Sequence, residues 1–253
     1  MNYDILTEIR NSNDLFIEWI GLLSNSLHRK DWGKSMKILD NLVPDCLDNN
    51  YSYLKSELIK KINPQIYREF KHAKRVSLYA MKLAKSLTLS KLDINEVEQG
   101  GFLHDLGKLI IDQRILYKDD ILSQHEWKII HNHPRFGCEL LSWSEHFKQL
   151  RPIIEQHHEH YDGSGYPKGL KGDEILYASR ILSVVDAYDA MTCNRSYQRR
   201  IGSDAAIEEI KRCSGSQFDP EIAFVFIESV LKNYNCSMFE NHQAVYKKYV
   251  AVK

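Results

Sequence analysis

The sequence predicts an all-α fold, and two observations support this class. Apolar residues recur at helical spacing along most of the chain. No alternating apolar and polar run of useful length, of the kind that a strand shows, is present. The chain has 253 residues, 43% hydrophobic and 27% charged, which is an ordinary globular balance with enough length to bury a core. We therefore expect packed helices without a sheet.

The first sixty residues are expected to form amphipathic helices on either side of a break at Asp31-Trp32-Gly33. The apolar positions at helical spacing are Leu15, Trp19, Leu22, Leu23 and Leu27, followed by Met36, Leu39, Leu42 and Val43. Pro64 then stands where a first-turn proline would open the next helix. We divide the chain into a small N-terminal helical region, residues 1–62, and a larger domain, residues 63–253, although no linker marks the boundary.

The remaining elements follow from the same periodicity. A long helix is expected from Pro64, and Asp93 is a suitable N-cap for the next helix, which reaches His104. Further helices are predicted at residues 121–130, 136–143, 147–158, 175–191, 203–213 and 219–232. The last of these is expected to open at Asp219-Pro220. Residues 161–172 hold four of the twelve glycines and one of the six prolines, so they are predicted to form a loop.

Charge and cysteine usage exclude several classes of protein. The chain has 34 basic and 34 acidic residues and a formal net charge of zero, which does not favour binding to a nucleic acid polymer. Its cysteines are odd in number, scattered and without a CxxC pair, so we expect neither a disulfide framework nor a thiolate zinc site. They are Cys46, Cys138, Cys193, Cys213 and Cys236. No secretory signal and no apolar run of about 18 residues appears, so a cytoplasmic protein without a membrane span is expected.

Two adjacent pairs of polar residues indicate a metal site. They are His104-Asp105 and His157-His158. Neighbouring residues on a helix point about 100° apart, so both members of a pair can serve one site only at a helix end or where more than one ion is bound. Gly107 would let the chain break after His104-Asp105 and would let Lys108 turn toward the same site. Two ions bridged by a carboxylate would use both pairs.

Single residues add support of unequal strength. Asp186 lies in the apolar run Val184-Val185-Asp186-Ala187, where an acid is costly to bury unless it is paired or metal-bound. His72 lies on an amphipathic helix, where a histidine is more often an ordinary structural residue. His157-His158 could equally be a surface pair. Imidazole and carboxylate ligands suit iron, manganese, nickel or zinc.

The ordered motifs resemble the HD-GYP family, a branch of the HD metal-dependent phosphohydrolases. The resemblance covers about 150 residues, from near Glu69 to Pro220. The matching runs are HDLGK at 104–108, HPRFG at 133–137, HHEHYDGSGYPKGL at 157–170, a helix ending VVDAYDA at 184–190, RSY at 195–197 and FDP at 218–220. Many matches in the same order make the resemblance specific, whereas a single His-Asp pair would not.

The resemblance implies an HD-domain helical bundle that hydrolyses cyclic di-GMP to pGpG, and in some members to GMP. Two divalent transition-metal ions are implied as cofactors, with iron or manganese favoured and nickel or zinc as alternatives. The implied metal ligands are His72, His104, Asp105, His133, His157, His158 and Asp186. Asp105 would bridge the ions and, with Lys108, carry catalysis. Lys108, Tyr166, Gly165 and Arg195 would contact substrate, and Asp189 would support a ligand.

The implied chemistry suits these residue types. A phosphodiester resists attack because its anionic oxygens repel a nucleophile, and two cations can bind those oxygens and activate water. Lys108 supplies a point charge and Arg195 a bidentate contact for the phosphate. Gly163 and Gly165 would let the backbone approach a ligand closely, although they could equally be turn residues only.

The sequence also departs from the family pattern. Members with a third metal carry a glutamate four residues before the first ligand histidine. That position is Arg68 here, and Glu69 is one residue away, which rotates the side chain by about 100° and favours two metals. His160 replaces a usual arginine, and Gln198 a common basic residue. Three further histidines, His125, His131 and His146, are interpreted as structural or surface residues.

Two alternative functions remain open at this point. The chain could be a catalytically weak cyclic-dinucleotide receptor or protein-interaction module that signals through its N-terminal helices. It could also hydrolyse another cyclic dinucleotide or a nucleotide, since the Gly-Tyr-Pro loop does not distinguish guanine from adenine. The N-terminal region could mediate homodimerisation or contact signalling proteins, and apolar stripes of that kind are also common in plain core packing.

Overall fold

The computed structural model describes residues 64–142, 147–193 and 201–231, and these segments are mostly helical. Over these ranges the only strand-like pairing is an isolated bridge between Ser214 and Phe218. The all-α class is therefore confirmed. The N-terminal helical region predicted for residues 1–62 lies outside the described residues and stays a prediction.

Nine α-helices and three short 3-10 or π turns make up the described part of the chain. The α-helices are α5 (Pro64–Ser86), α6 (Lys91–Leu103), α7 (Gln113–Leu116), α8 (Gln124–His131), α9 (His133–Leu141), α10 (Leu150–Glu155), α11 (Tyr177–Thr192), α12 (Ser203–Arg212) and α13 (Pro220–Val225). The short turns are η1 (Leu106–Ile110), η3 (Gly172–Glu174) and the π-helical η4 (Phe226–Leu231). Among these described helices, none is both long and apolar enough to cross a membrane.

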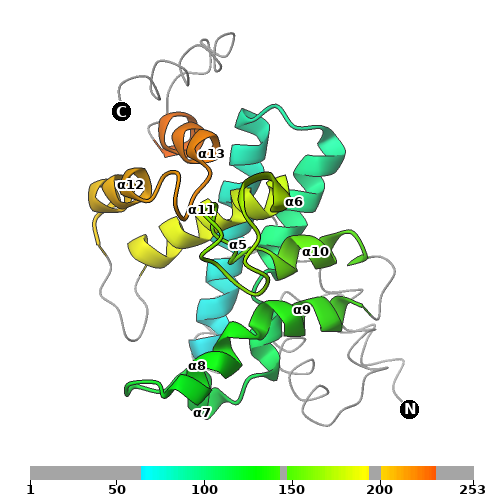
Figure 1. The fold of residues 1–253 in the computed structure, drawn as a ribbon, viewed down its shortest axis with the longest axis vertical. Helices are drawn as coiled ribbons and strands as arrows, with labels where there is room; N and C mark the ends of the chain where they lie inside the picture. The colour runs from blue at the N-terminus through cyan, green and yellow to red at the C-terminus, as the bar shows by residue number, and fades with distance from the viewer. Residues whose placement is uncertain (1–63, 143–146, 194–200, 232–253) are drawn as a thin grey trace, which may run out of the picture.

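Helices α5, α6 and α11 form the centre of the fold, with α12, α13 and η4 at one end and α7 and α8 at the other (Figure 1). The apolar periodicity of α5 explains this position, because Val76, Ala80 and Leu83 are completely buried. Helix α11 is apolar on most sides and buries Ile181, Leu182, Val184 and Val185, as its sequence predicts.

The start of α6 differs from the prediction. Ser90, and not Asp93, is the N-cap, since the Ser90 hydroxyl accepts a hydrogen bond from the Asp93 backbone N–H. Both residue types cap helices well. Leu92 lies between them and is exposed, so the first turn of this helix is not fixed by burial of this apolar residue.

The helices after α7 overlap the predicted segments, but their ends differ from the predicted ends. Helix α9 begins at His133, three residues before the predicted start, and α10 covers only the middle of the predicted segment 147–158. Asp219 caps α13 through bonds from the Glu221 and Ile222 amides, as the Asp-Pro pair predicts. The loop predicted at residues 161–172 is confirmed, apart from Gly172, which begins η3.

Candidate metal centre

Three buried histidines share one local arrangement at the ends of helices. His104 is the C-cap of α6, His133 follows the end of α8, and His157 follows the end of α10. In each of them Nδ1 lies 2.6 to 2.8 Å from the backbone carbonyl three residues earlier. Helix ends leave carbonyls without partners, so each imidazole N–H satisfies one of them. The ring proton is thereby placed on Nδ1, and the Nε2 lone pair points away from the helix.

Those Nε2 atoms face one another in pairs. His72 Nε2 lies 3.2 Å from His104 Nε2, and His133 Nε2 lies 3.3 Å from His157 Nε2. His72 Nδ1 is 2.7 Å from Asp189 Oδ2, which assigns its proton to Nδ1 as well. When both rings are neutral and carry their protons on Nδ1, their facing Nε2 atoms have only lone pairs. Such a pair can form a hydrogen bond only if one Nε2 takes up a second proton. A metal cation satisfies both lone pairs at once, and this donor set therefore fits a metal.

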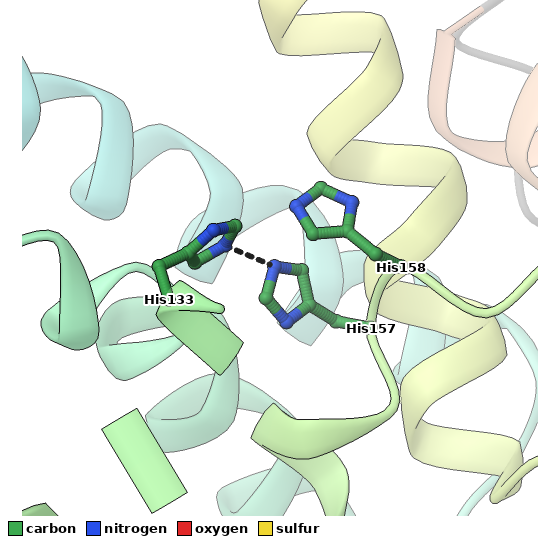
Figure 2. Close-up of side chains that lie close together, drawn as sticks. All are labelled: His133, His157 and His158. Atoms are coloured by element: carbon green, nitrogen blue, oxygen red, sulfur yellow. Dashed lines mark hydrogen bonds between the residues drawn. The ribbon is translucent and has the colours of Figure 1, made fainter. Parts of the chain in front are cut away.

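The paired histidines belong to overlapping groups of ligand atoms, all within 4.8 Å of one another inside each group. The groups found in the described residues are His72 with His104 and Asp186, His133 with His157 and His158, and His104 with Asp105 and His157. Figure 2 shows the second group, in which three imidazoles from two segments of the chain converge. All seven metal ligands implied by the family resemblance thus lie in one continuous cluster.

Asp105 lies between the first two groups. Its Oδ2 is 3.4 Å from His72 Nε2 and 3.3 Å from His104 Nε2, while its Oδ1 is 3.2 Å from His133 Nε2. Each carboxylate oxygen therefore faces a different group. A carboxylate in this orientation is suited to bridge two ions.

The break in the chain after α6 produces this geometry. Asp105 lies between the end of α6 and the start of η1, so His104 and Asp105 are not consecutive residues of one regular helix. Gly107 allows η1 to pack directly on α9, because a Cβ there would lie 1.9 Å from the His133 carbonyl oxygen and 2.5 Å from the Gly137 nitrogen. Backbone contact at Gly107 therefore brings Asp105 close to His133.

Burial and neighbouring charges keep most of these ligand side chains in the protonation state that binds a metal, which is a neutral imidazole or an ionised carboxylate. Burial, followed by the positive potential of neighbouring histidines, holds the pKa of His157 well below its usual range and lowers the pKa of His158 to about 3. Both rings are neutral near pH 7. Although burial opposes it, the surrounding histidines hold the pKa of Asp105 and Asp186 well below the usual carboxyl range.

His72 and His104 differ from the other histidines. Burial alone lowers the pKa of His104, but the carboxylates of Asp105 and Asp186 outweigh it and raise the pKa to about 9. Burial also lowers the pKa of His72, but the carboxylates of Asp105, Asp186 and Asp189 outweigh it and raise that pKa well above its usual value. A proton shared between the Nε2 atoms of His72 and His104 occupies the position where a metal would bind. Metal binding must therefore release this proton.

The structure describes only some of the residues that are expected to contact substrate. Lys108 Nζ lies 2.5 Å from Asp105 Oδ2, beside the cluster. Tyr166 stacks on His158 with ring centroids 4.9 Å apart, and burial raises the pKa of its hydroxyl well above the usual range. Gly165 packs on its own chain, since a Cβ there would lie 2.2 Å from the His160 nitrogen. Arg195 and Gln198 lie outside the described residues.

Asp189 supports His72, and Asp189 is in turn bound by Arg75, a residue that the sequence analysis did not identify. Arg75 Nε donates to Asp189 Oδ1 at 2.6 Å, and Arg75 Nη2 donates to Asp189 Oδ2 at 2.9 Å. This bidentate pair fixes the carboxylate that holds the His72 ring. Arg75 lies three residues after His72, on the same side of α5, and this spacing could have revealed it.

Glu159 was named only as part of a motif, but it holds the glycine-rich loop. Its side chain is almost fully buried and its two oxygens accept the backbone N–H groups of Lys168 and Leu170, at 2.7 and 3.0 Å. The Tyr166 N–H donates to the His158 carbonyl at 3.1 Å. The loop is thereby folded back so that Tyr166 covers His158.

Other histidines and the possible third-metal position fall outside the ligand groups. His160 Nδ1 lies 2.9 Å from the Ser164 hydroxyl, and neither His160 nor Glu69 is part of a ligand group in the described segments. His125 and His131 are exposed, as expected for surface residues. His131 nevertheless stacks on Tyr166, which the sequence analysis did not anticipate.

Comparisons with known proteins agree with this arrangement. A family model described as "HD domain" matches residues 56–222. The chain is 34% identical over 165 residues to a cyclic di-GMP phosphodiesterase of Thermotoga maritima, covering 62% of this chain and 44% of that protein. It is 40% identical over 148 residues to the cyclic di-GMP phosphodiesterase response regulator RpfG of Xanthomonas campestris, covering 58% and 39%.

A further relative has a different named substrate. The chain is 34% identical over 159 residues to the 3'3'-cGAMP-specific phosphodiesterase 2 of Vibrio cholerae, covering 62% of this chain and 30% of that protein. The chain thus spans less than half the length of each of these curated relatives.

The fold also resembles that of solved structures. An HDGYP protein from Bdellovibrio bacteriovorus has a TM-score of 0.56 at 17% identity and covers 85% of this chain and 69% of its own. A cyclic GMP-AMP-specific phosphodiesterase of Vibrio cholerae has a TM-score of 0.50 at 21% identity and covers 64% and 44%. With the family model covering more than half of the residues and the ordered motifs of the HD-GYP branch in place, this chain belongs to the HD domain family.

Proposed function

We propose that the chain is a metal-dependent phosphodiesterase that hydrolyses cyclic di-GMP to pGpG, and in a further step to GMP, at a site with two metal ions. The observation that carries this proposal is the pairing of buried Nε2 lone pairs, at 3.2 and 3.3 Å, on either side of the Asp105 carboxylate. Such an arrangement has a clear chemical use only if cations lie between the rings.

The proposed ligand sets follow the groups of atoms in the structure. His72, His104 and Asp186 would hold one ion; His133, His157 and His158 would hold the other; and Asp105 would bridge them. When bound, divalent ions of this kind neutralise phosphate oxygens and lower the pKa of a coordinated water. These seven ligands, five imidazoles and two carboxylates, favour iron or manganese, with nickel or zinc as alternatives.

Charged and aromatic residues beside the cluster would act on the substrate. The Lys108 ammonium holds one oxygen of Asp105 and places a positive charge where phosphate would approach. Arg195 would give a bidentate phosphate contact, and Tyr166, with Gly165 at the turn before it, would contact the nucleotide. A two-ion count is supported by Arg68, which replaces the glutamate of three-metal members.

The named activities of the relatives support a cyclic dinucleotide as substrate. Two relatives are named for cyclic di-GMP and one for 3'3'-cGAMP. Both compounds are cyclic purine dinucleotides with two phosphodiester bonds. We favour cyclic di-GMP because the relative with the highest of these three identities, at 40%, is named for it.

Substitution of Asp105 tests the proposal. The full chain is purified without oxygen, its metal content is measured, and products of cyclic di-GMP hydrolysis are followed by chromatography. We expect about two metals per chain and turnover that falls by at least about 100-fold in Asp105→Asn, because the bridging carboxylate loses charge. His125→Ala, an exposed histidine outside the ligand groups, is the control and should retain activity.

The same experiment distinguishes the alternative function. A fully metallated chain that binds cyclic di-GMP tightly but releases no product would be a receptor. A folded chain that contains no metal, and in which substitutions of His104 and His157 have no effect, would rule out the metal site altogether.

A further inference from the structure

Four aromatic rings form a continuous run from the metal cluster to the protein surface. The run begins at His158, continues through Tyr166 and His131, and ends at Trp127. Tyr166 lies on His158 with ring centroids 4.9 Å apart and planes 28° apart. His131 lies on Tyr166 at 4.2 Å with planes 12° apart, which is close parallel stacking. Trp127 meets His131 edge to face at 5.3 Å.

The outer end of this run is open. Trp127 is 48% exposed and His131 is also exposed, although large aromatic side chains are usually covered. The two residues are four positions apart on α8, so they lie on the same face of that helix. An exposed indole and an exposed imidazole, with ring planes 60° apart, therefore adjoin each other at the outer end of the run.

Helix α8 holds these rings in place. Its first turn carries a capping box, in which Ser123 and Glu126 bond each other's backbone N–H groups. Lys118 also donates to both oxygens of Glu126, at 2.8 and 2.9 Å. Such caps stabilise a short helix against fraying. The aromatic surface is therefore carried by a fixed element.

We infer that Trp127 and His131 form a stacking subsite for one purine base of the cyclic dinucleotide whose phosphate is bound at the metal cluster. This inference rests on the proposed function. The His131 ring is two stacking steps, of 4.9 and 4.2 Å, from His158. A sugar and a base extend a comparable distance from a phosphate, so a base attached to a phosphate at the cluster can reach His131 and the adjoining Trp127. Aromatic side chains stack on the π-face that every base has. Guanine and adenine both bind in this way, so the subsite accepts either purine without distinguishing the two bases.

Two truncations with matched controls test the subsite. Trp127→Ala and His131→Ala are compared with Trp127→Phe, which keeps a ring, and with His125→Ala, an exposed histidine on the same helix. Binding of cyclic di-GMP and cyclic di-AMP to the metal-loaded full chain is measured by calorimetry. Helix content and metal per chain are measured for every variant.

We expect each alanine variant to weaken the binding of both dinucleotides about tenfold, corresponding to about 1.4 kcal/mol. In turnover this should appear as a higher KM with kcat nearly unchanged, and metal content should stay the same. Trp127→Phe should lose much less, and His125→Ala nothing. Unchanged affinity in both folded alanine variants would overturn the inference.

The outcomes also separate this inference from the proposed function. If the wild-type chain hydrolyses cyclic di-GMP and the alanine variants have the same KM, the enzyme proposal stands and the subsite fails. If binding depends on both rings but no product forms, the subsite stands and the enzyme proposal fails.

Discussion

At the scale of single residues, the site depends on where each imidazole carries its proton. The family resemblance, carried by motifs in a specific order, implied the seven proposed ligands, and the adjacent His-Asp and His-His pairs account for four of them. The spacing of Arg75 from His72 could have drawn attention to Arg75, but its partner Asp189 lies 114 positions away in sequence, so the patterns did not reveal the pair. They also could not show that His131 contacts Tyr166, since that contact depends on how the loop at 161–172 folds back.

The bond from His72 to Asp189 leads to a prediction for metal affinity. Asp189→Asn should weaken metal binding roughly 10- to 100-fold, because the neutral amide no longer supports the His72 ring as strongly. Affinity is measured by competition with a chelator of known affinity. Asp112→Asn is a matched control, since Asp112 also binds an arginine, Arg114, but in an exposed pair. Equal affinity in both variants would contradict a supporting role for Asp189.

At the scale of elements, the site is assembled where helices end and not along their faces. The helical periodicity predicted where most of these helices lie, but ends are set by capping and packing, which periodicity does not report. Ser90 in place of Asp93 at the start of α6 is one example. The predicted segment 136–143 is another, because the helix begins at His133, and Pro134 in its first turn could have indicated that start.

The contact between η1 and α9 leads to a prediction for stability. Gly107→Ala should lower the free energy of unfolding by about 3 kcal/mol or more, because the new methyl group would overlap the His133 carbonyl and other backbone atoms that cannot move aside. Gly202→Ala is the control, since a Cβ there meets nothing within 4 Å, and it should cost less than about 1 kcal/mol. Denaturant unfolding of both variants measures the difference. Similar stabilities would show that the close approach of the two elements is not required.

At the scale of the whole molecule, the cluster connects segments that are distant in sequence. The proposed ligands come from α5, from the ends of α6 and α10, from the start of α9, and from α11, so they join most of the described fold. The all-α class and the general order of elements were predictable, because apolar periodicity reports burial directly. The arrangement of those elements in space was implied only by the family resemblance.

Removal of metal should therefore lower the stability of the entire described fold. A ligand present at 100 to 1,000 times its dissociation constant stabilises the folded state by about 3 to 4 kcal/mol. For a chain of this size each kcal/mol corresponds to roughly 2–4 °C in Tm. Calorimetry before and after chelation, and again after metal is restored, measures the shift. An unchanged Tm in a chain shown to lose its metal would contradict the connection between site and fold.

The three histidines that bond to carbonyls at helix ends have one more consequence. Because those bonds form with the helices, the rings are oriented before any ion arrives, and the site is preorganised. The conformational entropy of arranging the ligands is lost during folding and not during metal uptake. The apo and metal-bound chains should consequently have the same helix content at temperatures well below unfolding. Exchange of one metal for another would then proceed without refolding, so that the supply of metal in the surroundings, more than any rearrangement of the protein, would decide which ion the chain carries.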